Sequence, residues 1–294
     1  MRQENNPGGD APAAIPGTLY LVGTPIGNLE DLTLRALRLL KEVSVVACED
    51  TRQTQKLLNH YDIRTPALSY HEHNEAERAA ELVARLRAGS SVALVSDAGT
   101  PCISDPGYRL VHLAIREGIR VTPIPGACAF LCALIGSGLA VDAFHFNGFL
   151  PAKSGQRRTV LEALRHSVHT EVFYETPQRI TAALEDMVAI LGPDRPLVIA
   201  REITKLHEEF LRGPAGNLLA AARQTPLRGE ITLIVSRRES RQPGVEAASL
   251  RQRIDQIMEQ QGGDEKAALK IAARERKISR SEAYRELQRL KSGS

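Results

Sequence analysis

The sequence predicts an α/β protein with two α/β domains and a small helical C-terminal tail, the first sheet being mostly parallel and the second mixed. Two observations lead to this fold class. Short β-branched and apolar runs alternate with helical patterns along most of the chain, and Arg, Gln and Ala replace the β-branched residues near residue 240. Near-continuous apolar strands alternating with helices are typical of a parallel sheet covered on both faces. A chain of 294 residues is long enough to bury two cores.

The first half of the chain contains five apolar runs that predict strands. These runs are residues 18–23, 43–48, 66–70, 91–96 and 120–125. Apolar residues that recur every three or four positions predict helices over residues 29–42, 51–60, 74–88, 107–117 and 127–137. The stretch 147–158 combines Gly, Pro, Ser and charged residues and indicates a domain boundary. The first domain is therefore expected over residues 18–147, after a flexible leader over residues 1–17.

The second domain is expected over residues 148–238. Its candidate strands are residues 170–175, 197–202, 207–212 and 230–236. Its candidate helices are residues 157–166, 178–191 and 216–224. Helices come less regularly between the later strands, which favours a mixed sheet of α+β character.

The last part of the chain, residues 245–294, predicts a basic helical tail. Helical patterns cover residues 250–260, 264–275 and 279–291, with a Gly262-Gly263 break after the first. From residue 241 onward there are 12 Lys and Arg against 8 Asp and Glu, although the whole chain carries only +3. The basic excess therefore lies in the tail and indicates a polyanionic partner.

Composition also excludes several protein classes. The apolar runs are much shorter than the roughly 18 residues that a membrane span needs. The N-terminal residues contain no apolar segment of an export signal. Four cysteines without such a signal indicate reduced thiols. We therefore expect a soluble, cytoplasmic protein that does not bind a membrane.

Three Gly- and Pro-rich loops follow strands of the first domain, at residues 23–28, 97–101 and 123–127. The carboxyl ends of parallel strands are where ligands bind in such sheets. The Pro residues remove the backbone N–H donors that a phosphate needs, whereas Asp97 and outward carbonyls suit a neutral or cationic ligand, such as a nucleoside bearing a sulfonium. Glu49 and Asp50 follow the second strand, where dinucleotide-binding enzymes keep a ribose-binding acid, so a dinucleotide site stays open.

Polar groups also lie at strand ends of the second domain, in residues 173–177, 201–205 and 228–230. Together with residues 49–52 they predict a cofactor cleft between the two domains. His71 and His73 would share one face of an extended segment, but no third ligand follows nearby, so we assign no metal.

Several motifs together resemble the tetrapyrrole methylase family, from about residue 17 to residue 235. The motifs are GTLYLVGTPIGNLEDLTLRAL, VVACEDTR, SYHEHNE, LVSDAGTPCISDPGYRLV, PIPGACA, NGFLP, FYETPQRI, REITKLHEEF and RGEITLIV. Within that family they look like the branch that methylates small-subunit ribosomal RNA. Corrin-pathway relatives carry GxGPGD in the first loop, whereas this chain has GTPIGN, and the missing aspartate argues against a tetrapyrrole substrate.

The resemblance implies S-adenosyl-L-methionine as cofactor and methylation of the ribose 2′-oxygen of a cytidine in the decoding region of small-subunit (16S) ribosomal RNA. The substrate would be the RNA or the 30S particle, and the enzyme a homodimer. The family's cofactor-binding positions fall on Pro25, Asp97, Ala98, Gly99, Thr100, Ile103, Gly126 and Ala127, with Phe149, Tyr174 and Arg201 completing the adenosyl pocket.

A ribose hydroxyl is a poor nucleophile while protonated, so the reaction needs a group that holds or removes its proton. The candidate catalytic residues are Asp50, Glu175, Glu202 and Lys205. Arg52 and Arg201 are suited to binding the flanking RNA phosphates, and Arg157 and Arg158 are further candidates for contacts with the substrate RNA. The alternatives are a small-molecule methylase of the corrinoid type, a dinucleotide-binding oxidoreductase and a non-enzymatic RNA-binding module. The last fits poorly because the chain offers few aromatic residues for base stacking.

Overall fold

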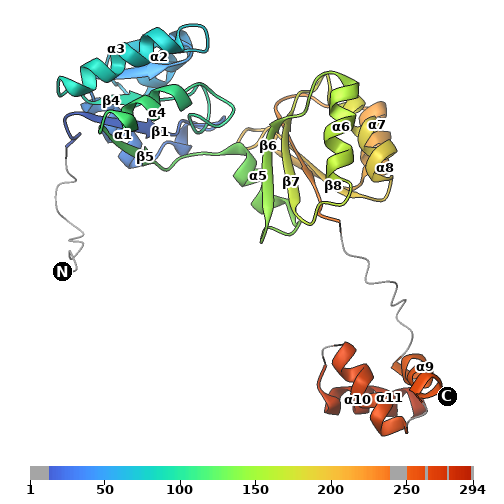
Figure 1. Ribbon diagram of the computed structural model, residues 1–294. Helices are drawn as coiled ribbons and strands as arrows, with labels where there is room; N and C mark the ends of the chain where they lie inside the picture. Colours follow the sequence, from blue (N-terminus) through green and yellow to red (C-terminus); the bar gives the residue numbers. More distant parts are fainter. Residues whose placement is uncertain (1–12, 239–249, 262–263, 277, 293–294) are drawn as a thin grey trace, which may run out of the picture. The chain divides into compact units, whose positions relative to one another are not determined.

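The computed structural model describes residues 13–238, 250–261, 264–276 and 278–292 (Figure 1). Contacts divide the chain into a unit that ends at Arg238 and a second unit that begins at Glu239. The first unit contains two sheets and the second contains the tail helices. Most of the predicted leader, residues 1–12, lies outside the described residues. No helix among the described residues is long and apolar enough to cross a membrane.

The first sheet is parallel, as predicted, with the strand order β3-β2-β4-β1-β5. Its strands are β1 (Thr18–Val22), β2 (Val45–Cys48), β3 (Ala67–Ser69), β4 (Val92–Leu94) and β5 (Arg120–Ile124). The connecting helices are the 3₁₀ helix η1 (Leu29–Asp31) and the α-helices α1 (Leu34–Glu42), α2 (Thr51–His60), α3 (Glu75–Arg87) and α4 (Tyr108–Arg116). Every predicted strand of this domain is present, a little shorter at its ends than its apolar run.

Both faces of this sheet are covered, which is why its strands lack polar alternation. Side chains of α1 and α2 pack with Tyr20 and Val22 on one face. Side chains of α3 and α4 pack with Leu19 on the other face. Successive residues of a strand point to opposite faces, so β1 contributes to both cores. Apolar burial on both sides fixes the positions of the strand ends, and these carry the loops described below.

The second sheet is mixed, again as predicted, with the order β6-β7-β10-β8-β9. Its strands are β6 (Phe144–Phe149), β7 (Thr170–Glu175), β8 (Pro196–Arg201), β9 (Glu209–Pro214) and β10 (Ile231–Val235). The β6–β7 pair is parallel, and the three other pairs are antiparallel. The helices are α5 (Ala129–Ser137), α6 (Ser154–Leu164), α7 (Ile180–Leu191) and α8 (Ala215–Gln224).

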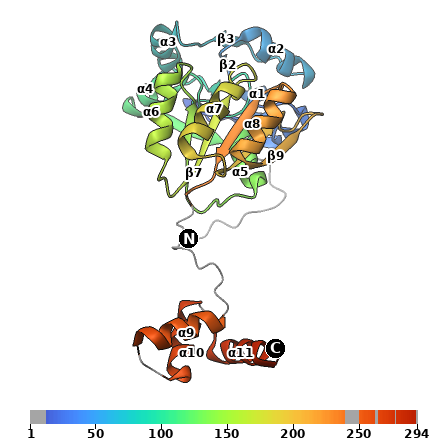
Figure 2. The same ribbon diagram turned by 90° about the vertical axis from the view of Figure 1, so that its right-hand side faces the viewer.

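Helices α6, α7 and α8 cover one face of this sheet and α5 packs on the other (Figures 1 and 2). The pleat divides the side chains accordingly. Phe173 and Leu233 point toward α6–α8, whereas Val172 and Ile234 point toward α5. Ile26, from the loop after β1, belongs to the same core cluster as α5. This cluster connects the first loop of the parallel sheet to the second sheet.

The two sheets lie in one compact unit, and the expected boundary at residue 147 does not separate them. A boundary after residue 147 falls inside β6, which pairs with β7 in the second sheet, and α5 also packs on that sheet. The strand Phe144–Phe149 was missed because its sequence, FHFNGF, contains His, Asn and Gly and lacks the apolar run used to find the other strands. The strand expected at residues 207–212 begins two residues later, at Glu209.

The tail unit contains the three predicted helices, α9 (Leu250–Gln261), α10 (Glu265–Glu275) and α11 (Arg280–Ser292). Their apolar stripes form one small core that includes Leu250, Ile254 and Leu269. Ser279 begins α11 with a capping box. Its Oγ accepts the N–H of Glu282 at 3.2 Å, and its own N–H donates to the Glu282 carboxylate at 2.9 Å.

Candidate functional site

The three Gly- and Pro-rich loops lie side by side because β4, β1 and β5 are neighbours in the sheet. Thr24 N–H donates to the Gly99 carbonyl at 2.8 Å, and Gly99 N–H donates back to the Thr24 carbonyl at 3.1 Å. On the other side, Gly23 and Gly126 approach so closely that a Cβ atom on Gly23 would lie 2.9 Å from the Gly126 Cα. Glycine is therefore required at this contact.

Side chains add further bonds between the loops. Thr24 Oγ1 donates to the Ser96 carbonyl at 3.1 Å, and Thr100 Oγ1 donates to the Ala127 carbonyl at 3.2 Å. Thr24 is buried, so these bonds are shielded from water. The three loops form one hydrogen-bonded surface at the carboxyl edge of the sheet.

The loop after β4 continues through a strained segment. Cys102 and Ser104 have positive φ angles of 70° and 61°, a backbone conformation that residues other than glycine rarely adopt. Backbone strain of this kind costs on the order of 1–3 kcal/mol per residue and clusters at functional sites. Ile103, Ser104 and the following Asp105 line the cavity described next.

A cavity of about 350 Å³ lies between these loops and the second sheet. This volume falls in the range of small-molecule sites. Most of the residues expected to bind the cofactor line it, namely Asp97, Ala98, Gly99, Thr100, Ile103, Phe149 and Tyr174. The structure also adds lining residues that were not selected from the sequence, namely Ile26, Ser104, Asp105, Cys128, Ala129, Thr176, Pro177, Ile203, Gly229, Glu230, Ile231 and Thr232.

Some of these additions had a signal in the sequence. Ser104 and Asp105 directly follow the selected Ile103, and Gly229 and Glu230 lie in a polar group already noted at residues 228–230. Thr232 had no such signal, because it lies inside a strand whose residues are all buried, and the sequence of that strand does not show which of them reach the cavity. Sheet register is a tertiary property and cannot be found from one strand alone.

Four residues expected at the cofactor do not line this cavity: Pro25, Gly126, Ala127 and Arg201. Gly126 and Ala127 hold the loops together through the contacts given above. Arg201, at the end of β8, donates through Nε to the Glu209 carboxylate at 2.6 Å and through Nη1 to the Arg228 carbonyl at 3.3 Å. Their assignment as cofactor ligands stays a prediction.

The cavity is acidic. Asp97, Asp105, Glu175 and Glu230 line it, and none of its described lining residues is Lys, Arg or His. Burial raises the pKa of Asp105 to about 6, helped by the nearby carboxylates of Glu49 and Asp97. Glu175 and Glu230 have cationic partners behind the wall, Arg179 and Lys205, whereas Asp97 and Asp105 form no ion pair among the described residues and favour a positively charged ligand.

Glu175 is the only expected catalytic side chain among the described residues that line the cavity. It is 3% exposed. Its Oε1 lies 2.6 Å from Arg179 Nη2 and accepts the Thr176 N–H at 2.8 Å. Its Oε2 is buried and has no hydrogen-bond partner in the described structure. A buried oxygen of this kind is costly unless a ligand supplies the missing partner.

Glu202 and Lys205 lie next to the cavity and not in its wall. Lys205 Nζ donates to Glu202 Oε1 at 2.9 Å and to the lining residue Glu230 at 3.0 Å. The hydrogen bond from Lys205 lowers the pKa of Glu202. Burial lowers the pKa of Lys205, but its bonds to Glu202 and Glu230 outweigh burial, so the pKa is raised overall. Lys205 is thus protonated at neutral pH and poorly suited to act as a neutral base.

Asp50 and Arg52 form an exposed pair at the start of α2. Asp50 caps the helix by accepting the Arg52 N–H at 2.8 Å, and the Arg52 guanidinium holds the same carboxylate at 2.7 Å. These bonds lower the pKa of Asp50 to about 2. Asp50 N–H donates to Asp97 Oδ1 at 3.1 Å, which links α2 to the cavity wall.

The two arginines expected to grip RNA from α6 differ in their surroundings. Arg157 is 4% exposed, and its guanidinium lies 2.6 Å from Asp186. This burial corrects the expectation for Arg157, because a guanidinium enclosed by a buried ion pair cannot reach a phosphate. Arg158 is about half exposed, with a longer contact of 3.4 Å to Asp186. It stays a candidate.

The sequence pattern of the family described as Tetrapyrrole (Corrin/Porphyrin) Methylases matches residues 18–219, from β1 into helix α8, and so includes every strand of the two sheets except β10. The chain belongs to the tetrapyrrole methylase family. This membership confirms the resemblance found in the sequence and assigns the loops and the cavity to a methylase fold.

Relatives within this family match most of the chain. A protein of Halalkalibacterium halodurans named ribosomal RNA small subunit methyltransferase I is 55% identical over 219 residues, 74% of this chain and 75% of that protein. A protein of the same name from Synechocystis is 45% identical over 91% of this chain and 96% of its own length. The uroporphyrin-III C-methyltransferase of Thermus thermophilus, solved with S-adenosylhomocysteine, shares the fold, with a TM-score of 0.53 at 22% identity over 74% of this chain and 97% of its own.

The ion-pair cluster beside the cavity of this methylase depends on a glycine. A Cβ atom on Gly229 would lie 2.3 Å from the Glu202 carboxylate, and Gly229 has a φ of +84°. Gly229→Ala should therefore displace Glu202 from Lys205. Gly89→Ala is the matched control, because Gly89 has a φ of +92° and nothing within 4 Å of the added Cβ.

Urea unfolding should show both variants losing about 1–2 kcal/mol from the left-handed backbone, with Gly229→Ala losing more. The lowered pKa of Glu202 stabilises the fold above the ordinary carboxyl pKa and ceases to do so as pH falls through the folded-state value. The extra loss should therefore shrink below about pH 4. Equal losses in the two variants at neutral pH would show that Gly229 does not protect this cluster.

Proposed function

We propose that this protein transfers a methyl group from S-adenosyl-L-methionine to the ribose 2′-oxygen of a cytidine in the decoding region of small-subunit ribosomal RNA. The observation that carries the proposal is the acidic cavity, which has no basic lining residue among those described, at the loops of a methylase-family fold. The relatives that match at 45–55% identity are named for ribosomal RNA of the small subunit, and this supports the choice of substrate.

The residues of the cavity fit the proposed cofactor, which carries a sulfonium and an amino group and supplies an activated methyl group. Ile26, Ile103 and Phe149 offer apolar walls for the adenosyl moiety, while Asp97 and Glu175 place negative charge beside a cationic ligand. The orphaned Glu175 Oε2 is the atom of the wall that most needs a donor or a cation. Arg179 fixes that carboxylate in place.

Asp105 is the carboxylate best matched to accept the proton of the ribose hydroxyl. It lines the cavity, it is only partly buried, and its pKa of about 6 lies close to neutrality. A general base works best when its pKa is near the working pH. Asp50, with a pKa of about 2, is a much weaker base. Lys205 donates hydrogen bonds to both Glu202 and Glu230. Glu202 and Lys205 are therefore suited to holding Glu230 in place in the cavity wall, and not to accepting a proton.

RNA contacts are proposed for Arg52 and Arg158 of the first unit and for the basic tail. In the tail, Lys266 of α10 and Arg280 of α11 line one groove together with Tyr284. Cations on one surface bind phosphates without sequence preference, and such binding weakens as salt rises. The tail would thus add general RNA affinity, while the cavity performs the chemistry.

We also propose a homodimer. Leu131 and Ile135 of α5 and Phe144 of β6 are 45%, 70% and 38% exposed, respectively. Phe130 of α5 contacts Phe144, with 6.4 Å between the ring centroids, so these apolar side chains belong to neighbouring surfaces. Exposed apolar side chains in one area are typical of an interface between subunits.

The alternative functions are less well supported. The order β3-β2-β4-β1-β5 differs from the order 3-2-1-4-5-6 of dinucleotide-binding sheets, so an oxidoreductase of that type does not fit. A corrinoid-type methylase would share the fold and the cofactor, and the uroporphyrin-III enzyme shows that the fold serves such substrates. The GTPIGN loop and the basic tail favour RNA over a small macrocycle.

Incubation with methyl-labelled S-adenosyl-L-methionine should label small-subunit ribosomal RNA, presented either free or in 30S particles. A methylated 2′-oxygen cannot attack the neighbouring phosphodiester, so alkaline hydrolysis should leave the label in a resistant dinucleotide that contains cytidine. A uroporphyrinoid macrocycle is the control substrate and should remain unlabelled. Label recovered in mononucleotides, in bases or only in the macrocycle would reject the proposed reaction.

Asp105→Asn should lower the methyl-transfer rate by about 10²- to 10⁴-fold, the usual contribution of a general base. The wild-type rate should rise with pH through about 6, because the ionised carboxylate is the active form, and the variant should lose that rise. Calorimetry should show cofactor affinity largely retained. Asp142→Asn, which changes a surface carboxylate paired with Arg237, is the control and should leave rate and profile unchanged. A variant that keeps the wild-type pH profile would exclude Asp105 as the base.

Replacing Lys266 and Arg280 together by Gln in the full-length chain should weaken RNA binding at every sequence tested. Each lost phosphate contact should reduce the slope of log affinity against log salt by about 1, so the double variant should lose about 2. The control is the double change Arg116→Gln and Arg120→Gln, which removes the same charge from exposed positions of the first unit. Equal slopes for the two double variants would remove the proposed role of the tail groove.

A further inference from the structure

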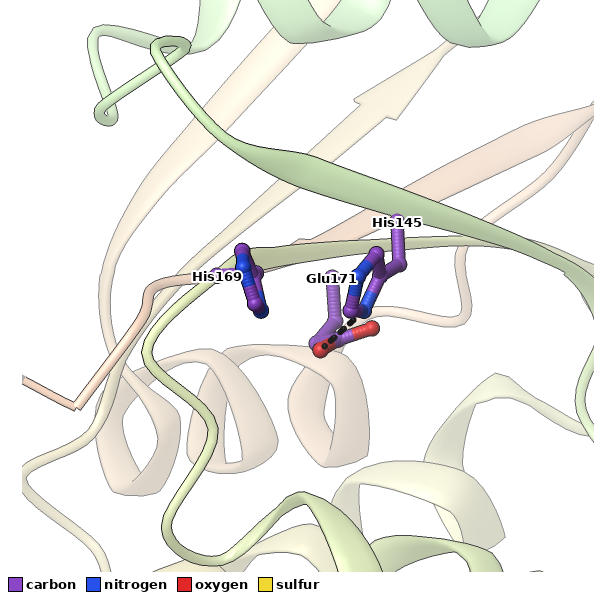
Figure 3. A group of neighbouring side chains, drawn as sticks. All are labelled: His145, His169 and Glu171. Carbon is purple, nitrogen blue, oxygen red and sulfur yellow. Dashed lines mark hydrogen bonds and ion pairs between the residues drawn. The ribbon is translucent and has the colours of Figure 1, made fainter.

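Two histidines and a glutamate meet on one face of the second sheet, at the opposite end of β6 and β7 from the cavity. His145 of β6 and Glu171 of β7 are direct partners in the parallel register. His169 precedes Glu171 by two residues. Because side chains two apart on a strand share a face, all three side chains lie on the same side (Figure 3). The sequence showed no such group, because β6 itself was missed.

The three side chains lie close enough to hold one ion. Their possible ligand atoms, one from each residue, all lie within 4.8 Å of one another. His145 Nδ1 is 3.2 Å from Glu171 Oε1, and the His145 and His169 ring centroids are 4.2 Å apart. Ligand atoms around a tetrahedral zinc ion are about 3.3 Å apart, given ion–ligand distances of about 2.0–2.1 Å. Rotation of the exposed His145 ring would bring the set together.

Glu171 differs from the other buried acids of this sheet in its counter-charge. Among the described residues of this domain, the buried carboxylates are Glu171, Glu175 and Asp186. Glu175 pairs with Arg179, and Asp186 pairs with Arg157. Glu171 is 1% exposed, and its ion-pair partner in the described structure is an imidazole, which carries charge only when protonated. Buried carboxylates are normally paired with a cation or coordinated to a metal.

Neutral donors hold the Glu171 carboxylate in place. Ser167 Oγ donates to Oε1 at 2.6 Å, and Asn147 Nδ2 donates to Oε2 at 2.7 Å. Both residues lie on the same face as the cluster, two positions from His169 and His145. Hydrogen bonds of this kind orient the carboxylates of metal sites and raise metal affinity. They leave the charge of Glu171 uncompensated.

We propose that His145, His169 and Glu171 bind a divalent transition-metal ion, and Zn²⁺ in particular. Two imidazoles and one carboxylate are a common three-residue zinc set, with a fourth position left for water. The ion would tie the edge strand β6 to β7 and neutralise Glu171. Phe149 of β6 and Tyr174 of β7 line the cavity. At the rise of about 3.3 Å per residue of a strand, Phe149 lies about 13 Å along β6 from His145.

Titration calorimetry with ZnCl₂ on the full-length, untagged, chelator-treated protein tests the site. One ion should bind per chain at about pH 7.5. His145→Ala and His169→Ala should each lower the affinity by more than about tenfold, and Asn147→Ala by about tenfold. Zn²⁺ should also raise the melting temperature of the wild-type protein but not of the two His variants.

His73→Ala is the matched control, because His71 and His73 form the other close pair of imidazoles, 5.9 Å apart. This variant should bind Zn²⁺ like the wild type. Replacing zinc by Co²⁺ should give the visible absorption of a four-coordinate ion in the wild type and in His73→Ala only. The inference is overturned by a wild-type protein that binds no Zn²⁺, or by binding that survives His145→Ala and disappears in His73→Ala.

Discussion

The contact between the loops after β1, β4 and β5 is the constraint on which the rest of the first unit depends. Gly23 and Gly126 meet backbone to backbone, and Thr24 and Gly99 exchange two hydrogen bonds. These contacts are possible only because β1 lies between β4 and β5 in a parallel sheet. They fix one wall of the cavity, and Ile26, from the same loop, reaches the core of the second sheet. The loops thus form one wall of the cavity, and through Ile26 they also pack against the second sheet.

Electrostatics then decides what the site can hold. Of the carboxylates in the cavity wall, Asp97 and Asp105 form no ion pair among the described residues, so a cationic ligand would neutralise their charge. In the second domain, two buried acids form ion pairs with arginines: Glu175 with Arg179, and Asp186 with Arg157. Glu171 has no arginine partner among the described residues and lies beside an imidazole instead. In the proposed site, a metal ion would supply the positive charge that an arginine supplies to the other two acids.

Much of the fold could be predicted because apolar burial leaves a periodic trace in the sequence. The five strands of the parallel sheet are covered on both faces and so appear as continuous apolar runs. β6 is an edge strand with the sequence FHFNGF, partly exposed, and it gave no such run. The same limit explains why Arg157 was expected at the surface. The sequence shows that Arg157 belongs to a basic cluster. Only the packing of α6 against α7 shows that Arg157 is enclosed there and paired with Asp186.

The fold class, the three loops and most of the expected residues that line the cavity follow from the sequence alone, because each depends on local composition or on a motif that stays together in the chain. Only the tertiary structure shows which acids face the cavity, since Asp105 and Glu230 come from segments far apart in the chain, and their side-chain directions depend on loop strain and strand register. It also brought His145 beside Glu171, a pairing that exists only because β6 and β7 run parallel in one sheet. Contacts between segments distant in the chain leave no periodic trace, and for that reason only the folded chain reveals them.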